Sequence, residues 1–262
     1  MRSRLTLAIV VSFLAAPALA EDGGGTAARG LYAGIFGGGG GRSSGDVTQR
    51  GTVFFSEAVG GPMAVNATGQ TDSSSAWLFG AQIGHEWAFR SVLAAVELEG
   101  LYLPGRTQHA RLENPTDRLA EQTFDDSFKM SSGVILGNLV LNFPASDRSV
   151  TPYVGGGIGF ARVSITGADS TAINPPEAGV NHFNSGTDSS VWTFAAQAKA
   201  GVRFALDEHT YLFGEYRYLL IDATDQKFGS TAYSTHAPTS EWTARFDATS
   251  YHLATFGIGM SF

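Results

Sequence analysis

Apolar and polar residues alternate along most of the chain, which is the pattern of β-strands that have one apolar face. The final strand is the clearest case, because every second residue from Ala254 to Phe262 is apolar and the residues between are Gly, Ser or Thr. No comparable stretch keeps the spacing of a helix. The alternation predicts eight strands, at residues 31–38, 77–87, 92–103, 129–143, 151–163, 191–204, 211–219 and 254–262.

The connections between these segments alternate in length. Residues 88–91, 144–149 and 205–210 form short connections, whereas 41–75, 104–126, 165–190 and 221–248 form long and polar ones. All short connections therefore fall at one end, as in outer-membrane barrels with short periplasmic turns. A soluble β-sandwich is the alternative, but connections of that length are uncommon in compact soluble domains. We expect an all-β fold: an eight-stranded antiparallel transmembrane up-and-down barrel with four long external loops.

The first twenty residues have the features of an export signal. Arg2 and Arg4 precede an apolar run, and Ala18-Leu19-Ala20 is a small-x-small cleavage pattern. The run is shorter than the roughly 20 residues that a membrane-spanning helix needs, which argues against a retained anchor. The sequence predicts a cleaved signal peptide at 1–20, a short N-terminal segment at 21–29 and a barrel at 30–262, exported to the outer membrane of a Gram-negative bacterium.

Composition excludes several classes of function. The chain has no cysteine, so disulfides, thiolate metal sites and cysteine nucleophiles are excluded. A formal net charge of −7 disfavours nucleic acid as a partner. The four long connections carry fifteen acidic residues, among them Asp125 and Asp126, against seven basic ones. We expect this excess to face outward, where it either keeps the surface soluble or shares divalent cations with lipopolysaccharide.

Charged residues also fall on the strand faces that point into the barrel. An eight-stranded barrel is just wide enough for side chains to fill, and unpaired buried charges are costly, so we expect a paired internal network. A narrow ion-conducting path is the alternative. The predicted network has four acids and three bases: Glu86, Glu97, Glu99, Lys199, Arg203, Glu215 and Arg217.

Two basic residues fall on the opposite, outward face. Lys129 and Arg162 lie by parity on the lipid-facing side of neighbouring strands, toward their external ends. Basic side chains cost little near the membrane interface. We expect that they contact lipopolysaccharide phosphates; the alternatives are that both simply lie above the membrane or that a bulge reverses the side to which they point.

Four segments resemble a known family. Residues 138–144 (NLVLNFP), 151–160 (TPYVGGGIGF), 215–218 (EYRY) and 256–262 (FGIGMSF) are similar to the opacity-protein and small-porin family of Gram-negative outer-membrane barrels. The resemblance implies the barrel fold, the location and a terminal signal at Phe256, Met260 and Phe262 that the barrel assembly machinery reads. Asn142 departs from the pattern, since many relatives have an acidic residue there.

Catalytic candidates are few. Ser250 and His252 lie two residues apart, but barrels that cleave acyl chains from lipid A have the His first. We therefore expect no enzyme, cofactor or metal. The predicted role is structural and surface-interactive, as in an adhesin or antigen. A narrow porin-like channel and a lipid A-modifying enzyme are the alternatives. The expected partners are outer-membrane lipid, lipopolysaccharide, the assembly machinery and an extracellular or host partner.

Overall fold

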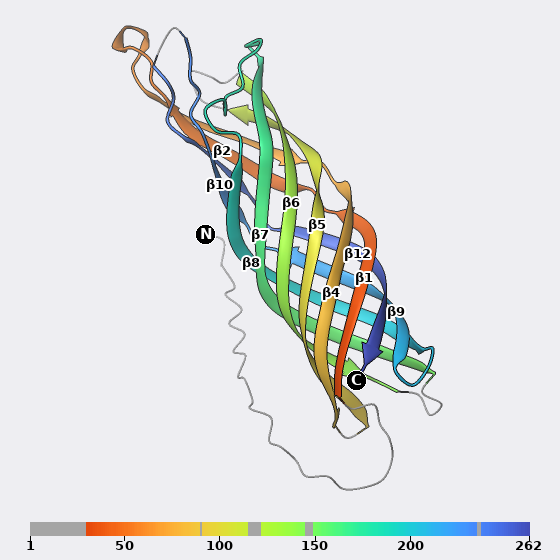
Figure 1. The fold of residues 1–262 in the computed structure, drawn as a ribbon. Helices are drawn as coiled ribbons and strands as arrows, with labels where there is room; N and C mark the ends of the chain where they lie inside the picture. Colours follow the sequence, from red (N-terminus) through yellow and green to blue (C-terminus); the bar gives the residue numbers. More distant parts are fainter. Residues whose placement is uncertain (1–29, 90, 115–121, 145–148, 235–236) are drawn as a thin grey trace, which may run out of the picture.

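The computed structural model describes residues 30–89, 91–114, 122–144, 149–234 and 237–262 (Figure 1). The predicted signal peptide and N-terminal segment lie outside these residues. No helix in the described ranges is long and apolar enough to cross a membrane. The described strands are β1 (Gly30–Arg42), β2 (Gly45–Val53), β3 (Met63–Thr71), β4 (Ser74–Phe89), β5 (Val92–Asn114), β6 (Gln122–Asn142), β7 (Val150–Asn174), β8 (Ser189–Ala205), β9 (Thr210–Ile221), β10 (Thr224–Phe228), β11 (Trp242–Phe246) and β12 (Thr249–Ser261), with a 3-10 turn at Glu57–Val59.

Eight of these strands close into a ring. Their order is β1, β4, β5, β6, β7, β8, β9 and β12, and β12 returns to pair with β1. Every pairing is antiparallel, from Tyr32 opposite Ser261 in the closing pair to Ala205 opposite Tyr211 beside a short turn. The expected eight-stranded antiparallel barrel is confirmed, because all eight predicted segments lie in ring strands.

The long connections are more ordered than the sequence pattern indicates. Strands β2 and β3 lie within the first connection, and β10 and β11 lie within the fourth. In addition, β5, β6 and β7 continue beyond the predicted strand ends. These segments form a structure that we call the external extension: β2, β3, β10 and β11 together with residues 106–114 of β5, 122–130 of β6 and 164–174 of β7 (Figure 1). Its strands pair in the order β10, β11, β2, β3 and β5.

Residues 175–188 join the two sides of the extension. The backbone N–H of His182 donates to the carbonyl of Ser170 on β7 at 2.8 Å. On the other side, the N–H of Gly229, just after β10, donates to the carbonyl of Gly186 at 2.8 Å. Backbone hydrogen bonds therefore continue between β7 and β10, so this connection is a structural part of the extension.

The extension has its own hydrophobic core. Trp242 of β11 is buried, and Phe124 and Phe128 of β6 lie in the same cluster as Phe183 and Phe246. Asp126, which we expected among the outward-facing acids, is also buried here. That expectation is wrong because 104–126 is largely strand, so its alternate side chains point inward. Each apolar run in the extension is short, and the periodicity is correspondingly weak.

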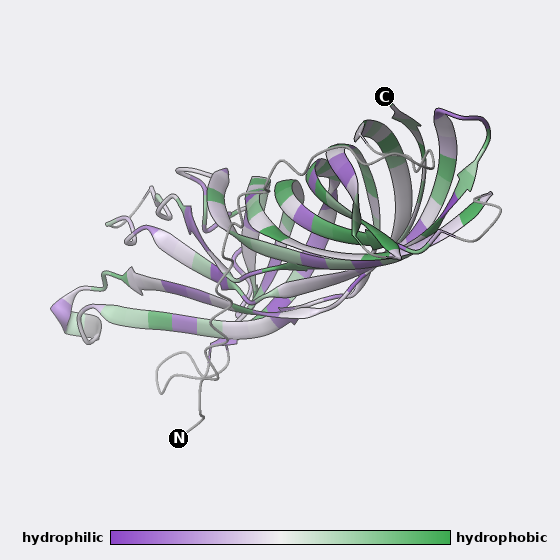
Figure 2. Cartoon of the chain, turned by 90° about the horizontal axis from the view of Figure 1, so that it is seen from below, coloured by the Kyte–Doolittle hydropathy of each residue, from purple (hydrophilic) through white to green (hydrophobic). Residues whose placement is uncertain are grey.

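The outer face of the ring is apolar. Large exposed side chains such as Ile35, Ile83, Leu98 and Leu139 cover the wall, and Figure 2 shows apolar residues recurring along the ring strands. Exposed aromatic residues lie near both ends of this surface. Trp77, Tyr102, Trp192 and Tyr218 lie toward the extension, and Phe89, Phe143, Phe204 and Phe262 lie at the other end. An apolar band between two aromatic girdles is the surface of a membrane-spanning barrel.

Candidate functional site

The barrel interior near the short turns holds the predicted charges. Strand parity directs Glu86 of β4, Glu97 and Glu99 of β5, Lys199 and Arg203 of β8, and Glu215 and Arg217 of β9 toward the axis. The structure brings all seven side chains into one network. Six of the residues are buried, and the side chain of Arg203 is 13% exposed.

Two cations bridge the acids at the centre of this network. The Lys199 Nζ lies 2.5 Å from Glu97 Oε1 and 3.1 Å from Glu99 Oε2. Arg217 extends one guanidinium nitrogen to Glu99 and the other to Glu215. Each of these three carboxylates therefore has a direct cationic partner.

Arg203 forms a second centre closer to the turns. Its Nη1 lies 3.0 Å from Glu86 Oε2. The guanidinium carbon also lies 4.9 Å from the ring centre of Tyr32, 5.4 Å from that of Tyr153 and 5.0 Å from that of Tyr211. Cation–π contacts of this kind add to the ion pair when water is excluded.

Neutral polar residues complete the network. The Asn138 Nδ2 donates to Glu97 Oε1 at 2.9 Å, and Gln197 Nε2 donates to Asn138 Oδ1 at 2.7 Å. Asn142, the departure from the family pattern, donates through Nδ2 to Glu86 Oε2 at 2.8 Å. Sequence reasoning missed Asn138 and Gln197 as site residues, although their parity matches that of the charges. Each of the four carboxylates thus has more than one hydrogen-bond or ion-pair partner, and these polar side chains fill this part of the barrel interior.

Glycines opposite the side chains of this network leave the room that these side chains occupy. A Cβ atom on Gly84 would lie 2.4 Å from Cζ of Tyr32, and one on Gly157 would lie 1.9 Å from Oδ1 of Asn138. Both contacts are impossibly short, so larger residues at these positions would displace the side chains opposite.

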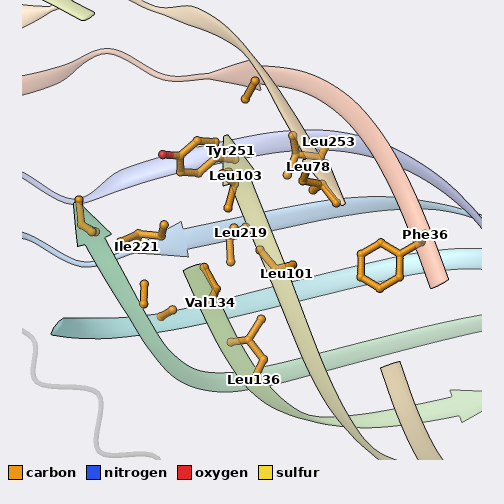
Figure 3. Close-up of a cluster of buried hydrophobic side chains, with 14 of the residues drawn as sticks. Phe36, Leu78, Leu101, Leu103, Val134, Leu136, Leu219, Ile221, Tyr251 and Leu253 are labelled. Atoms are coloured by element: carbon orange, nitrogen blue, oxygen red, sulfur yellow. The ribbon is translucent and has the colours of Figure 1, made fainter. Parts of the chain in front are cut away.

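A cluster of buried apolar side chains fills part of the barrel interior (Figure 3), and most of it lies between the charged network and the extension. Each ring strand contributes to this cluster of buried side chains. Its members include Phe36 of β1, Leu78 of β4, Leu101 of β5, Leu136 of β6, Val163 of β7, Ala195 of β8, Leu219 of β9 and Leu253 of β12. We call this cluster the apolar layer. It follows the barrel interior around its full circumference.

The two outward basic residues lie at different heights. Both Lys129 and Arg162 are exposed on the outer face. Arg162 is paired with Gly133 on β6, so Lys129 lies four residues further toward the extension. The Arg162 Nε donates to Ser190 Oγ at 2.8 Å, and the Lys129 stem lies against Gly105 of β5.

The terminal residues lie on the lipid-facing wall. Phe256, Met260 and Phe262 are all exposed there. The backbone N–H of Phe262 donates to the Leu31 carbonyl at 2.8 Å, so the chain end adjoins the pairing that closes the ring.

Ser250 and His252 have separate hydrogen-bond partners. The Ser250 Oγ lies 2.9 Å from Ser43 Oγ, and His252 Nδ1 lies 2.6 Å from the Tyr216 hydroxyl. These contacts fit polar residues at the membrane edge. In the described part of the chain, no three His, Asp or Glu residues are grouped so that they could hold a metal ion.

A closed antiparallel ring with an apolar outer face, aromatic girdles and a charged interior defines an outer-membrane β-barrel. The chain belongs to the outer membrane protein beta-barrel domain family, whose model matches residues 6–246. Family membership implies a location in the Gram-negative outer membrane.

Solved structures that are similar to this chain have little sequence in common with it. Neisserial surface protein A is 13% identical, with 88% of this chain and 97% of that chain covered and a TM-score of 0.39. OprG from Pseudomonas aeruginosa is 16% identical, with 89% and 96% covered and a TM-score of 0.41. The protease OmpT from Escherichia coli is 9% identical, with 90% and 97% covered and a TM-score of 0.46. Likeness at this level does not extend to function, and no curated protein gives a significant match.

Proposed function

We propose that this protein is a closed, non-conducting surface barrel whose role is structural and surface-interactive, as in an adhesin or a surface antigen. The observation that carries the proposal is the apolar layer, to which every ring strand contributes. An ion that entered this layer would lose its water and gain few polar partners, which is strongly unfavourable. The charged network below the layer is already paired internally, so it serves the barrel rather than a passing ion.

The external extension is the part of the molecule suited to contact with a partner. It rests on a hydrophobic core, so its strands present a fixed surface. At the tip of the β2–β3 hairpin, Phe54 and Phe55 are 44% and 36% exposed. Exposed aromatic side chains on an ordered support are common in protein contacts. An extracellular or host protein is the partner that this surface fits.

Single-channel recording in a planar bilayer tests the closed state. The purified protein should give no conductance steps, and a mock purification from cells that lack this protein controls for contaminating porins. A variant with Leu136→Ala and Leu219→Ala removes bulk from the apolar layer and should produce brief openings. Regular steps from the unaltered protein would instead support the narrow porin-like channel.

Contact with lipopolysaccharide through Lys129 and Arg162 is part of this proposal. Their exposure and their positions toward the extension support it, because lipopolysaccharide phosphates lie at that interface. Replacing both with Gln should lower the melting temperature in lipopolysaccharide-containing bilayers and leave it unchanged in neutral detergent. An equal change in both media would contradict the contact.

A further inference from the structure

The barrel wall is interrupted between β4 and β5, near the external aromatic girdle. Pairing of these strands ends at Phe79 opposite Tyr102. Further out, β5 pairs instead with β3, from Ala110 opposite Thr71 onward. Between these points the facing edges of β4 and β5 are not paired. We call this opening the wall gap and define it by residues 74–78 of β4 and 103–109 of β5.

The local sequence explains why the strands separate here. Pro104 has no N–H and cannot donate a hydrogen bond to a neighbouring strand. The β5–β6 register also shifts between Leu103 and Arg106, which is a β-bulge. A proline and a bulge at the same point turn the edge of β5 away from β4, so the gap follows from the sequence.

A small cavity lies at the wall gap. Its lining includes Trp77 and Pro104, which are exposed on the outer face, and Arg42, Gln108 and Tyr251, which are buried inside. Arg106 also lines it and is exposed, although its pairing with Met130 places it on the inner face of β5. Residues of both faces therefore line one cavity at the place where β4 and β5 are not paired. The cavity volume is about 20 Å³, which is room for one or two water-sized groups.

Arg42 is a buried cation without a buried anion. It is 5% exposed, and its Nη1 donates to Gln108 Oε1 at 3.0 Å and Thr71 Oγ1 at 3.4 Å. The Tyr251 side chain also lies beside it. Its Nε is buried and has no partner. Among the described residues, no carboxylate lies within ion-pair distance of Arg42, in contrast to the three cations of the interior network.

We propose that the wall gap binds the small acidic headgroup of an amphiphile, with the headgroup oxygens on Arg42 and the apolar chain on the lipid-facing wall beside Trp77. A buried guanidinium without a counter-ion is costly, and a carboxylate or phosphate supplies the missing charge in a geometry that Arg favours. Arg106 at the mouth and Lys129 close by add positive charge to the approach.

The position of the gap beside the membrane favours an amphiphile, rather than a freely dissolved anion, as the ligand. The cavity is lined in part by the girdle residue Trp77, at the level where headgroups and acyl chains meet. Leu103 and Ala76 line the cavity and also belong to the apolar layer beneath it. The headgroup therefore enters only as far as Arg42, and the chain stays in the membrane.

Titration calorimetry on protein in neutral phosphatidylcholine nanodiscs tests this site, with protein-free nanodiscs as the partition baseline. The probes are palmitate, hexadecyl phosphate and the uncharged hexadecanol. At least one acid should bind 10-fold or more tightly than hexadecanol, and the tighter acid identifies the headgroup as carboxylate or phosphate. Acetate and inorganic phosphate, which have no chain, should bind far more weakly.

Arg42→Gln should remove the preference for the acid, Arg42→Lys should restore part of it, and Arg245→Gln, a surface cation elsewhere, should leave it unchanged. Equal binding of acid and alcohol, undiminished binding by Arg42→Gln, or equally tight binding of the chainless anions would overturn the proposal. If Arg42→Gln fails to fold, Ser132→Leu fills the cavity and leaves Arg42 in place. Loss of acid binding by this variant supports the site, and unchanged binding overturns it.

Discussion

At the scale of single residues, Arg217 is the cation of the barrel interior that is most deeply buried among carboxylates. It is fully buried and holds Glu99 and Glu215 together. Replacing Arg217 with Met leaves two buried carboxylates without this partner, and breaking such an arrangement costs about 3–5 kcal/mol. Urea unfolding followed by tryptophan fluorescence should show this loss.

A matched surface variant separates this effect from the loss of any arginine. Arg245 pairs with Asp225, but both side chains are about half exposed. Arg245→Met should therefore cost less than about 1 kcal/mol. Similar small losses in both variants would mean that the interior network contributes little to stability.

Asp126 makes the extension sensitive to pH. Burial raises the pKa of this carboxyl from its ordinary value of 3.8 to about 7. Because the folded state holds the proton more tightly, stability is highest at low pH, falls as the pH rises from about 4 to about 7, and is then constant. Asp126→Asn removes the titrating group. The free energy of unfolding of this variant, relative to that of the unaltered protein, should therefore rise by about 3 kcal/mol between pH 5 and pH 8. Parallel stability profiles from urea unfolding of the two proteins would contradict this.

At this scale the sequence predicts which side chains point inward wherever the alternation along a strand is long enough to assign its two faces. A strand turns alternate residues to opposite faces, so seven charges on long alternating segments could be placed inside. Asn138 and Gln197 lie on the same faces, but an uncharged amide does not stand out among Gly and Ser. Asp126 was misplaced because the chain around it is rich in charge, and only the pairing of β6 shows that its side chain points inward.

At the scale of elements, the external extension and the membrane ring have separate cores. Trp242 anchors the extension core: it is buried, and its Nε1 donates to Thr231 Oγ1 at 3.0 Å. Trp242→Ala should cost about 3–5 kcal/mol by leaving a cavity. The extension should then become sensitive to thermolysin. The ring should stay folded, which we expect to see as a difference in mobility between boiled and unboiled samples on a detergent gel, because a closed barrel resists detergent until it is heated. Phe55→Ala, at the exposed hairpin tip, is the control. Simultaneous loss of ring and extension would show that the two cores unfold as one.

The limits of prediction at this scale follow from strand length. The ring strands carry long alternating runs, and all eight were identified. Strands β10 and β11 have five residues each, and β2 and β3 have nine, with Gly, Thr and Gln among them. The sequence Trp242-Thr-Ala-Arg-Phe246 does alternate, but five residues are too few to distinguish a strand from a loop without its partner. The wall gap was likewise missed, since Pro104 indicates an interruption only once β4 is known to lie beside it.

At the scale of the whole molecule, the interior is layered along the barrel axis. The charged network lies near the short turns, the apolar layer lies above it, the polar group around Arg42 follows, and the core of the extension lies furthest out. Each layer draws on strands that are distant in sequence. The apolar layer and the polar group around Arg42 include residues of both β1 and β12, so closure of the ring by this pair of strands completes them.

Phe262 adjoins this closure and belongs to the terminal signal that the family resemblance implies. It is 73% exposed on the lipid side, so it contributes little to packing within the folded barrel. Phe262→Ala should therefore lower the amount of inserted protein several-fold and leave the stability of the inserted fraction nearly unchanged. Phe204→Ala is the matched control, because Phe204 is another exposed aromatic at the same end of the barrel. The measurement is the heat-shifted band on detergent gels of outer-membrane fractions, compared with protein retained in the periplasm. Equal insertion of the two variants would show that Phe262 acts as an ordinary girdle residue, and reduced melting temperature of the inserted Phe262→Ala protein would show a packing role instead.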